Sequence, residues 1–180
     1  MKTVGVLALQ GGHDAHVAAL EQAGVAARLC RTPQDFAGLD GLILPGGESG
    51  VQLRLIGRHG LEGAMRELAA RGVPVLATCA GLILAAREVS PQQPSFGWLD
   101  VAVERNAWGR QVDSFEATDD AGARKLVFIR APRVKTVGKG VEVMATFRGE
   151  PVLIRQGAVV GAAYHPELAG AALHREIFGG

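Results

Sequence analysis

The first half of the chain alternates short apolar runs with segments whose apolar residues recur at helical spacing. The apolar runs predict buried strands at Thr3–Leu9, Ala26–Cys30, Gly41–Leu44 and Val73–Thr78. Between them, Asp14–Ala23 and Leu61–Arg71 have amphipathic patterns that end at Gly24 and Gly72, which is typical of helices. Because apolar strands alternate with helices, the pattern predicts a parallel sheet covered by helices on both faces.

The second half has a different pattern, in which short strands follow one another with few helices between them. Strands are predicted at Val101–Arg105, Gln111–Ala117, Leu126–Arg130, Val141–Phe147, Val152–Arg155 and Val159–Tyr164. Gly149 and Gly157 favour hairpin turns, and a last helix is predicted from about Ala171 to Phe178. We therefore expect one α/β domain over residues 1–180: an open, mostly parallel, flavodoxin-like sheet with helices on both faces and an antiparallel extension.

The composition is that of an ordinary globular domain. Of 180 residues, 48% are hydrophobic and 21% are charged, and 19 basic against 18 acidic residues give a formal net charge of +1. This balance gives no reason to expect nucleic acid or a membrane as a partner. No uncharged run reaches the roughly 20 residues of a membrane helix. Two cysteines do not form a disulfide framework, so we expect reduced thiols and a cytoplasmic protein.

One of these cysteines, Cys79, stands where a predicted strand ends and a helical pattern begins. Ligands of open α/β sheets gather outside the carboxyl ends of the strands. A tight strand-to-helix elbow needs small residues two positions before and after its nucleophile, and Ala77 and Gly81 meet that need. A helix N-terminus also favours the thiolate over the thiol. The alternative is a small buried core residue, the usual fate of a free cysteine, and we assign that role to Cys30.

A thiol nucleophile needs a base, and the base needs an orienting group. Among the histidines, His165 follows the predicted strand Val159–Tyr164 and so lies at a carboxyl end as well. Glu167 follows two residues later, and Pro166 stiffens the turn between them. A histidine and a glutamate at this spacing are usually part of a surface turn. Together with the cysteine elbow, however, they favour a Cys79–His165–Glu167 triad.

The third candidate element is the glycine-rich segment "LILPGGESG" at 42–50. Gly46 and Gly47 can expose backbone N–H groups beside the elbow, where they would receive an oxyanion together with the amide of Ala80. The alternative is a plain turn or a phosphate-binding loop. The segment lacks the Lys-Ser/Thr pair of a Walker loop, so nucleotide binding is disfavoured.

Together, the glycine loop, the cysteine elbow and the late His-x-Glu resemble the class I (triad-type) glutamine amidotransferases. Six segments narrow the resemblance to the glutaminase subunits of pyridoxal 5′-phosphate synthase, and they extend from residue 5 to about residue 168. They are "GVLALQG" at 5–11, "PGGES" at 45–49, "TCAG" at 78–81, "ERNAWGRQVDSFE" at 104–116, "FIRAP" at 128–132 and "HPEL" at 165–168.

The resemblance implies a role for each matching residue. Cys79 would be the nucleophile, His165 the base and later the acid, and Glu167 its orienting partner, with Gly47 and Ala80 as the oxyanion hole. Glutamine would be held by Gly47, Glu48, Ser49, Arg105, Ile129 and Arg130. In this set Glu48 suits the ammonium group of the substrate and Arg105 suits its carboxylate. No cofactor or metal is implied.

The resemblance also implies the reaction and the partner. L-Glutamine would be hydrolysed through a γ-glutamyl thioester to glutamate and ammonia. The ammonia would pass to a (β/α)8-barrel synthase subunit, which combines it with a pentose phosphate and a triose phosphate to make pyridoxal 5′-phosphate. Gly50 stands where the family usually has threonine, and Ala15 stands where it has glutamate. These departures concern partner docking rather than the triad.

Two other functions use the same residues. A cysteine hydrolase such as a γ-glutamyl hydrolase would need a wide cleft for a larger substrate. A flavodoxin-like binding module would leave the Cys79 thiol without a chemical role. Labelling with a glutamine-mimicking diazoketone is the test: mass added at Cys79 supports the amidotransferase, whereas an unlabelled thiol favours the binding module.

Overall fold

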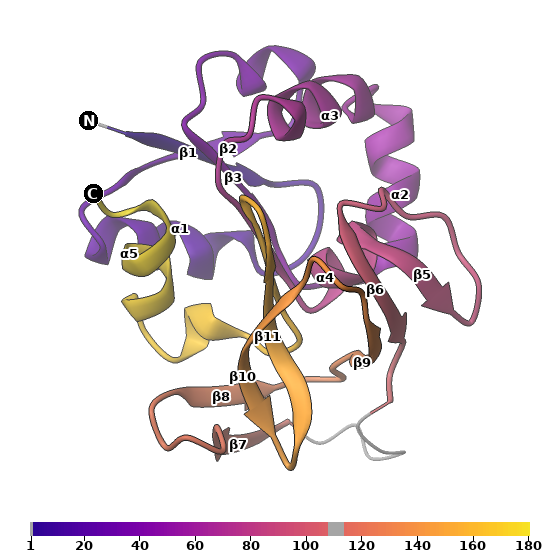
Figure 1. Cartoon of the computed structure of the whole chain (residues 1–180). Coiled ribbons are helices and arrows are strands. Elements are labelled where there is room, and N and C mark those ends of the chain that lie inside the picture. Colours follow the sequence, from indigo (N-terminus) through magenta and orange to yellow (C-terminus); the bar gives the residue numbers. More distant parts are fainter. Residues whose placement is uncertain (1, 108–113) are drawn as a thin grey trace.

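A seven-stranded sheet forms the centre of the structure, a computed structural model that describes residues 2–107 and 114–180 (Figure 1). Its strands are ordered β10-β11-β12-β4-β3-β1-β2. Their bounds are β1 (Thr3–Leu7), β2 (Ala26–Cys30), β3 (Gly41–Leu44), β4 (Val75–Thr78), β10 (Glu142–Phe147), β11 (Glu150–Gln156) and β12 (Val159–Ala162). The pairs from β2 to β12 are parallel, whereas β11 and β10 add an antiparallel edge.

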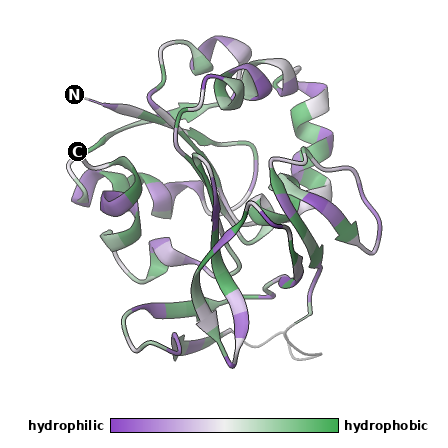
Figure 2. Cartoon of the chain, viewed as in Figure 1, coloured by the Kyte–Doolittle hydropathy of each residue, from purple (hydrophilic) through white to green (hydrophobic). Residues whose placement is uncertain are grey.

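Helices cover both faces of this sheet. On one face lie α1 (His13–Gln22) and α5 (Ala172–Phe178), and on the other lie α2 (Ser49–Arg58), α3 (Glu62–Ala70) and α4 (Ala80–Ala85) (Figure 1). Every residue of β3 and β4 is buried, as expected of central strands packed on both sides. Hydrophobic residues run along the central strands, while hydrophilic residues lie on the outer sides of the helices (Figure 2).

Two smaller sheets accompany the antiparallel edge. One contains β5 (Ala86–Ser90), β6 (Leu99–Glu104) and β9 (Arg133–Val137), with β5 parallel and β9 antiparallel to β6. The other is an antiparallel pair of β7 (Phe115–Thr118) and β8 (Lys125–Phe128). Short 3-10 helices, η1 (Pro33–Phe36) and η2 (Pro166–Leu168), complete the elements. The fold class predicted from the sequence is thereby confirmed. Within residues 2–107 and 114–180, no helix is long and apolar enough to cross a membrane.

Several predicted elements differ from those observed. The first strand ends at Leu7 rather than Leu9, and β12 ends at Ala162 rather than Tyr164. The predicted strand Gln111–Ala117 begins in residues 111–113, which lie outside the described residues, and its described part runs from Phe115.

Apart from the two short 3-10 helices, α2, β5 and β9 were not predicted. Helix α2 buries Ser49, Gln52 and Ile56, so its inward face is largely polar and gives no apolar helical period. Strand β5 exposes much of its length and therefore lacks a buried apolar run.

Candidate active site

Cys79 occupies a strained elbow between β4 and α4. Its backbone angles are φ 48° and ψ −104°, a region that residues with a side chain rarely adopt. The Cys79 N–H donates to the carbonyl of Ala162 in β12 at 2.9 Å, and its own carbonyl accepts from Ile83 at 3.2 Å. A Cβ at Gly81 would collide with the Leu44 carbonyl, so a glycine is needed there for α4 to pack against β3. The fold thus imposes the elbow that the sequence predicted.

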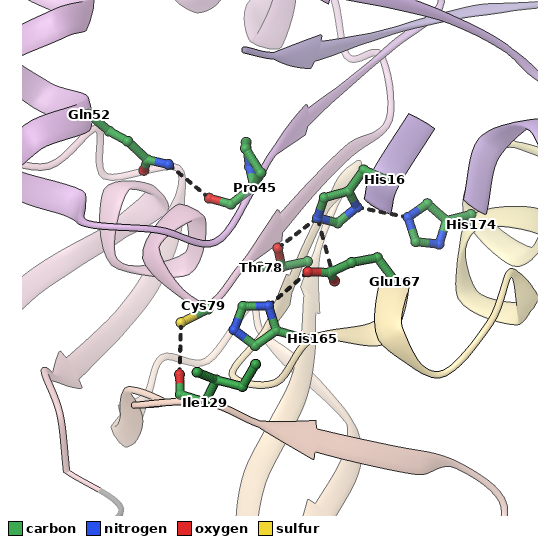
Figure 3. Close-up of polar contacts among 9 residues, drawn as sticks. All are labelled: His16, Pro45, Gln52, Thr78, Cys79, Ile129, His165, Glu167 and His174. Atoms are coloured by element: carbon green, nitrogen blue, oxygen red, sulfur yellow. Dashed lines mark hydrogen bonds and ion pairs between the residues drawn. The ribbon is translucent and has the colours of Figure 1, made fainter. Parts of the chain in front are cut away.

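His165 and Glu167 lie beside this elbow at the end of β12 (Figure 3). The His165 backbone N–H donates to Val127 at 2.8 Å, which fixes the start of the turn. Pro166 begins η2, and this turn brings Glu167 Oε1 to 2.7 Å from His165 Nδ1. Only 1% of the Glu167 side chain is exposed, so the carboxylate reaches His165 in an almost dry environment. The ring of His165 in turn faces the sulfur of Cys79 (Figure 3).

The electrostatics of this group favour a charged histidine. Burial by itself lowers the pKa of His165, but hydrogen bonds with Cys79 and Glu167 and the charges of both outweigh it and raise the pKa to about 10. Burial raises the pKa of Glu167, yet the hydrogen bond from His165 and the nearby imidazoles leave it below its ordinary value. The carboxylate is therefore ionised and stabilises an imidazolium at His165.

Cys30 has none of these features. It is fully buried at the end of β2, and burial, followed by the charge of Asp35, raises the pKa of its thiol to about 12. Its sulfur lies 3.6 Å from the Arg28 carbonyl and 3.8 Å from the Asp35 carbonyl. Cys30 is thus a core residue, as predicted.

The glycine-rich segment between β3 and α2 lies against Cys79 and His165 and is held in place by several hydrogen bonds. The Gly46 carbonyl accepts from Gly12 at 3.1 Å, and the Glu48 N–H donates to Gln10 Oε1 at 2.9 Å. Gln52 Nε2 donates to the carbonyls of Gln10 and Pro45 at 3.1 and 3.2 Å. A side chain at Gly46 would collide with the His165 ring, so only glycine lets the segment approach so closely.

A cavity of about 260 Å³ opens in front of Cys79 and His165. All the residues that were expected to hold glutamine line it: Gly47, Glu48, Ser49, Arg105, Ile129 and Arg130. Glu167 lies behind His165 and does not line the cavity. Ala80 is buried directly after Cys79, where its amide belongs to the first turn of α4.

Two contacts at the cavity were not foreseen. Arg130 Nη1 lies 2.8 Å from Glu48 Oε1, and about half of each side chain is exposed. The Cys79 thiol lies 3.7 Å from the Ile129 carbonyl. Glu48 is therefore not an isolated anion, because its charge is shared with a neighbouring guanidinium.

Sequence reasoning missed several polar residues that shape the site. Gln10 and Asn106 line the cavity. His16 and His174 are fully buried behind Glu167. The burial of His16 could have been inferred from the sequence, because His16 lies four residues before Leu20 and therefore on the same, buried face of α1. Within the described part of the chain, no group of histidine, cysteine and carboxylate side chains is arranged to hold a metal ion.

Comparison with known proteins gives matches over nearly the whole chain. The sequence model of the SNO glutamine amidotransferase family matches residues 6–177. The pyridoxal 5′-phosphate synthase subunit PdxT of Koribacter versatilis is 44% identical over 180 residues, covering 97% of this chain and 93% of its own length. The protein of the same name from a Parafrankia species is 49% identical over 176 residues, covering 93% and 86%. A crystal structure of a glutamine amidotransferase, 44% identical, matches with a TM-score of 0.89 over 97% of this chain and 96% of that one.

Proposed function

Because the chain belongs to the SNO glutamine amidotransferase family, we propose that it hydrolyses L-glutamine as the glutaminase subunit of a pyridoxal 5′-phosphate synthase. Curated relatives at 44% and 49% identity bear that subunit's name. The observation that carries the chemistry is that Cys79 and His165 face each other in an amino-acid-sized cavity while Glu167, behind the cavity wall, bonds the far nitrogen of His165. It combines a nucleophile, a base and an orienting carboxylate in one place.

In the first half of the proposed reaction, His165 holds a proton on Nε2 as an imidazolium, and the Cys79 thiolate attacks the side-chain carboxamide carbon of glutamine. The carbonyl oxygen becomes an oxyanion that accepts hydrogen bonds from the Gly47 and Ala80 amides. The tetrahedral intermediate then collapses, its C–N bond breaks, and His165 donates its proton to the departing nitrogen, which leaves as ammonia. A γ-glutamyl thioester on Cys79 remains.

In the second half, neutral His165 takes a proton from a water molecule, whose oxygen attacks the thioester carbon. Collapse of this second intermediate breaks the C–S bond and releases glutamate. The sulfur leaves as a thiolate beside protonated His165, which restores the starting state. Throughout the cycle, Glu167 holds the His165 Nδ1–H and stabilises the imidazolium each time it forms.

The charges around the cavity suit an amino acid. We propose that Glu48 binds the substrate ammonium and Arg105 its carboxylate, with Ser49 and the backbone of Ile129 and Arg130 completing the site. The Glu48–Arg130 ion pair implies that the ammonium competes with Arg130 for this carboxylate. Because both side chains are about half exposed, replacing Arg130 by the substrate ammonium at Glu48 costs little free energy.

The alternative of a γ-glutamyl hydrolase or peptidase receives less support. A cavity of about 260 Å³ is smaller than the roughly 300–1,000 Å³ typical of sites for drug-sized ligands. We propose instead that residues 1–180 act as one amidotransferase domain in the cytoplasm. Its partner would be a (β/α)8-barrel synthase subunit that receives the ammonia directly, which prevents its loss to bulk water.

The test is a glutaminase assay with and without the cognate synthase subunit, combined with diazoketone labelling. We expect ammonia that requires glutamine, and an added mass confined to Cys79. Labelling of Cys79 together with turnover of larger γ-glutamyl substrates would favour the hydrolase. An unlabelled thiol and no ammonia in the presence of the synthase would favour the binding module.

A further inference from the structure

A buried polar cluster continues behind Glu167, on the side away from the cavity (Figure 3). His16 from α1, Thr78 from β4 and His174 from α5 are all fully buried. His16 Nε2 lies 3.5 Å from Glu167 Oε2 and 3.1 Å from Thr78 Oγ1. On its other side, His16 Nδ1 lies 2.9 Å from His174 Nε2. The reaction proposed above uses none of these three side chains.

Both buried histidines are neutral at neutral pH. Burial lowers the pKa of His16 to about 4, against the opposing charge of Glu167, and burial likewise lowers that of His174 to about 4. A neutral imidazole has one N–H donor and one acceptor nitrogen. The hydrogen bonds of the cluster can therefore run in one of two directions, from His174 through His16 toward Glu167 or the reverse. The groups at the two ends of the cluster decide between these directions.

Donation toward Glu167 is the favourable direction. If His16 has its proton on Nε2, that N–H donates to Thr78 Oγ1 and also faces Glu167 Oε2, a buried oxygen with no hydrogen-bond partner in the described residues. His16 Nδ1 is then an acceptor and receives the Nε2–H of His174. The opposite direction would set a nitrogen lone pair of His16 against an ionised carboxylate.

The far end of the cluster supports the same direction. Within the described residues, His174 Nδ1 is buried and has no hydrogen-bond partner. In the favoured direction this atom carries only a lone pair, whereas in the opposite direction it would be a buried N–H without an acceptor. Orphaned buried N–H groups are rarer in proteins than under-satisfied acceptors.

We propose that His16 is a positioning residue for Glu167, and that His174 fixes the tautomer in which His16 faces the carboxylate with an N–H. The proposal rests on the orienting role assigned to Glu167. The carboxylate would then be hydrogen-bonded at Oε1 by His165 and faced at Oε2 by the His16 N–H, whose nitrogen lies 3.5 Å away. Its plane is fixed and it stays ionised in a dry site, so His165 keeps the orientation and basicity that activate Cys79.

Few polar or titratable groups face Glu167 and the buried polar cluster behind it, so the response of the cluster to pH can be assigned. Glu167 is faced by His165 and His16, and His16 by His174 and Thr78. Without the His16 N–H, the buried carboxylate loses a stabilising donor and takes up a proton more readily. His165 then loses its counter-charge as the pH falls, so the acid limb of Cys79 reactivity moves to higher pH.

A matched pair of variants of the full chain tests this inference without glutamine. His16→Leu removes the donor, whereas His16→Gln retains an N–H at the reach of Nε2. The readout is the rate of alkylation of Cys79 by iodoacetamide between pH 5 and pH 9, read by mass spectrometry. Cys30 serves as the internal unreactive thiol. His59→Leu, at the exposed end of α2, is the control for loss of a histidine.

We expect His16→Leu to slow alkylation of Cys79 near neutral pH about 10-fold, by analogy with the outer partners of functional histidines. Its acid limb should move to higher pH, while His16→Gln and His59→Leu stay close to the parent. Equal slowing in both His16 variants, in step with equal losses of unfolding free energy, would mean a merely structural role and would overturn the proposal. An unchanged His16→Leu would also overturn it.

Nitrogen NMR of the parent chain gives a second test that needs no variant and holds even if His16→Leu fails to fold. We expect both His16 and His174 in the Nε2–H tautomer and neutral down to about pH 5. Either histidine in the Nδ1–H tautomer would refute the proposed direction of donation from His174 through His16 toward Glu167. Neither readout uses glutamine, so a chain that lacked glutaminase activity could still pass both tests, and the two proposals fail separately.

Discussion

The carboxyl ends of β2 and β4 lie at the same edge of the sheet, and a buried cysteine stands at each. Cys30 ends β2 within regular strand geometry, and its carbonyl accepts the Ala8 N–H at 3.0 Å. Cys79 follows β4 with φ 48° and faces the ring of His165. Both thiols are therefore buried, and both lie at the edge formed by the carboxyl ends of the strands. The strained elbow and the adjacent base distinguish Cys79, and these features define the candidate nucleophile.

Removing each sulfur in turn should give the largest difference between the two cysteines. Cys79→Ala should abolish glutamine hydrolysis, with a loss of about 10⁶-fold by analogy with removal of the nucleophile from a serine protease triad. Cys30→Ala should leave turnover near the parent value, because its thiol packs in the hydrophobic core and its hydrogen bonds go to backbone carbonyls. Glutamate production by each variant with the synthase subunit is the measurement.

Added ammonium salts provide the control for this experiment. They should restore product formation by the synthase in complex with Cys79→Ala, which shows that the variant still folds and docks. Comparable turnover in Cys79→Ala and Cys30→Ala would contradict the assignment of the nucleophile.

The next largest effect is expected at Glu167, the carboxylate that bonds the histidine beside Cys79. Glu167→Gln keeps the shape but cannot stabilise the imidazolium of His165, and its amide favours the wrong tautomer. In a comparable triad this kind of change lowers turnover about 10⁴-fold. The measurement is kcat for glutamine hydrolysis by the complex. A change of less than a few-fold would reduce Glu167 to a structural turn residue.

The difference between the two cysteines was partly visible in the sequence. Ala77 lies two residues before Cys79 and Gly81 two residues after it, and a Cβ at position 81 would collide with the Leu44 carbonyl. His165 and Glu167 follow an apolar strand, so their place at the same sheet edge followed from the strand pattern. The family and the fold class are confirmed, whereas the roles of the individual site residues stay predictions.

Other parts of the site depend on contacts that the sequence pattern does not encode. His16 and His174 are 158 positions apart, and only the packing of α1 against α5 brings their rings together. The Glu48–Arg130 pair joins two loops in a similar way. Helix α2 was missed because its buried face carries Gln52, whose amide holds the segment before Gly46. Polar residues buried for a local purpose give no hydrophobic period.

A smaller effect concerns the glycine-rich segment, which approaches Cys79 and has no counterpart at Cys30. Gly47, at φ 151°, adopts a backbone conformation open mainly to glycine, so its peptide can turn its N–H toward or away from the site. The loss of one oxyanion donor costs about 10²–10³-fold in turnover. We therefore expect the subunit alone to be a poor glutaminase that docking to the synthase accelerates by up to this factor.

The measurement is steady-state glutamate production during titration with the synthase subunit. Mixtures made with Cys79→Ala give the background rate. A turnover number that does not change at saturating synthase would mean that the segment is already competent and that docking serves only to deliver ammonia.

The smallest expected effect is on stability, where the two cysteines should respond with opposite signs. A residue with a side chain in the Cys79 conformation costs on the order of 1–3 kcal/mol, and glycine removes that cost while losing about 0.5–1 kcal/mol of chain entropy. Cys79→Gly should therefore be more stable than Cys79→Ala by about 1 kcal/mol. At Cys30 the backbone is an ordinary strand, so Cys30→Gly should be less stable than Cys30→Ala by about 1 kcal/mol. Urea unfolding of the four variants measures both differences. If glycine destabilises both positions equally, the elbow holds no strain in solution and the geometric contrast between the cysteines lies in the His165 contact alone.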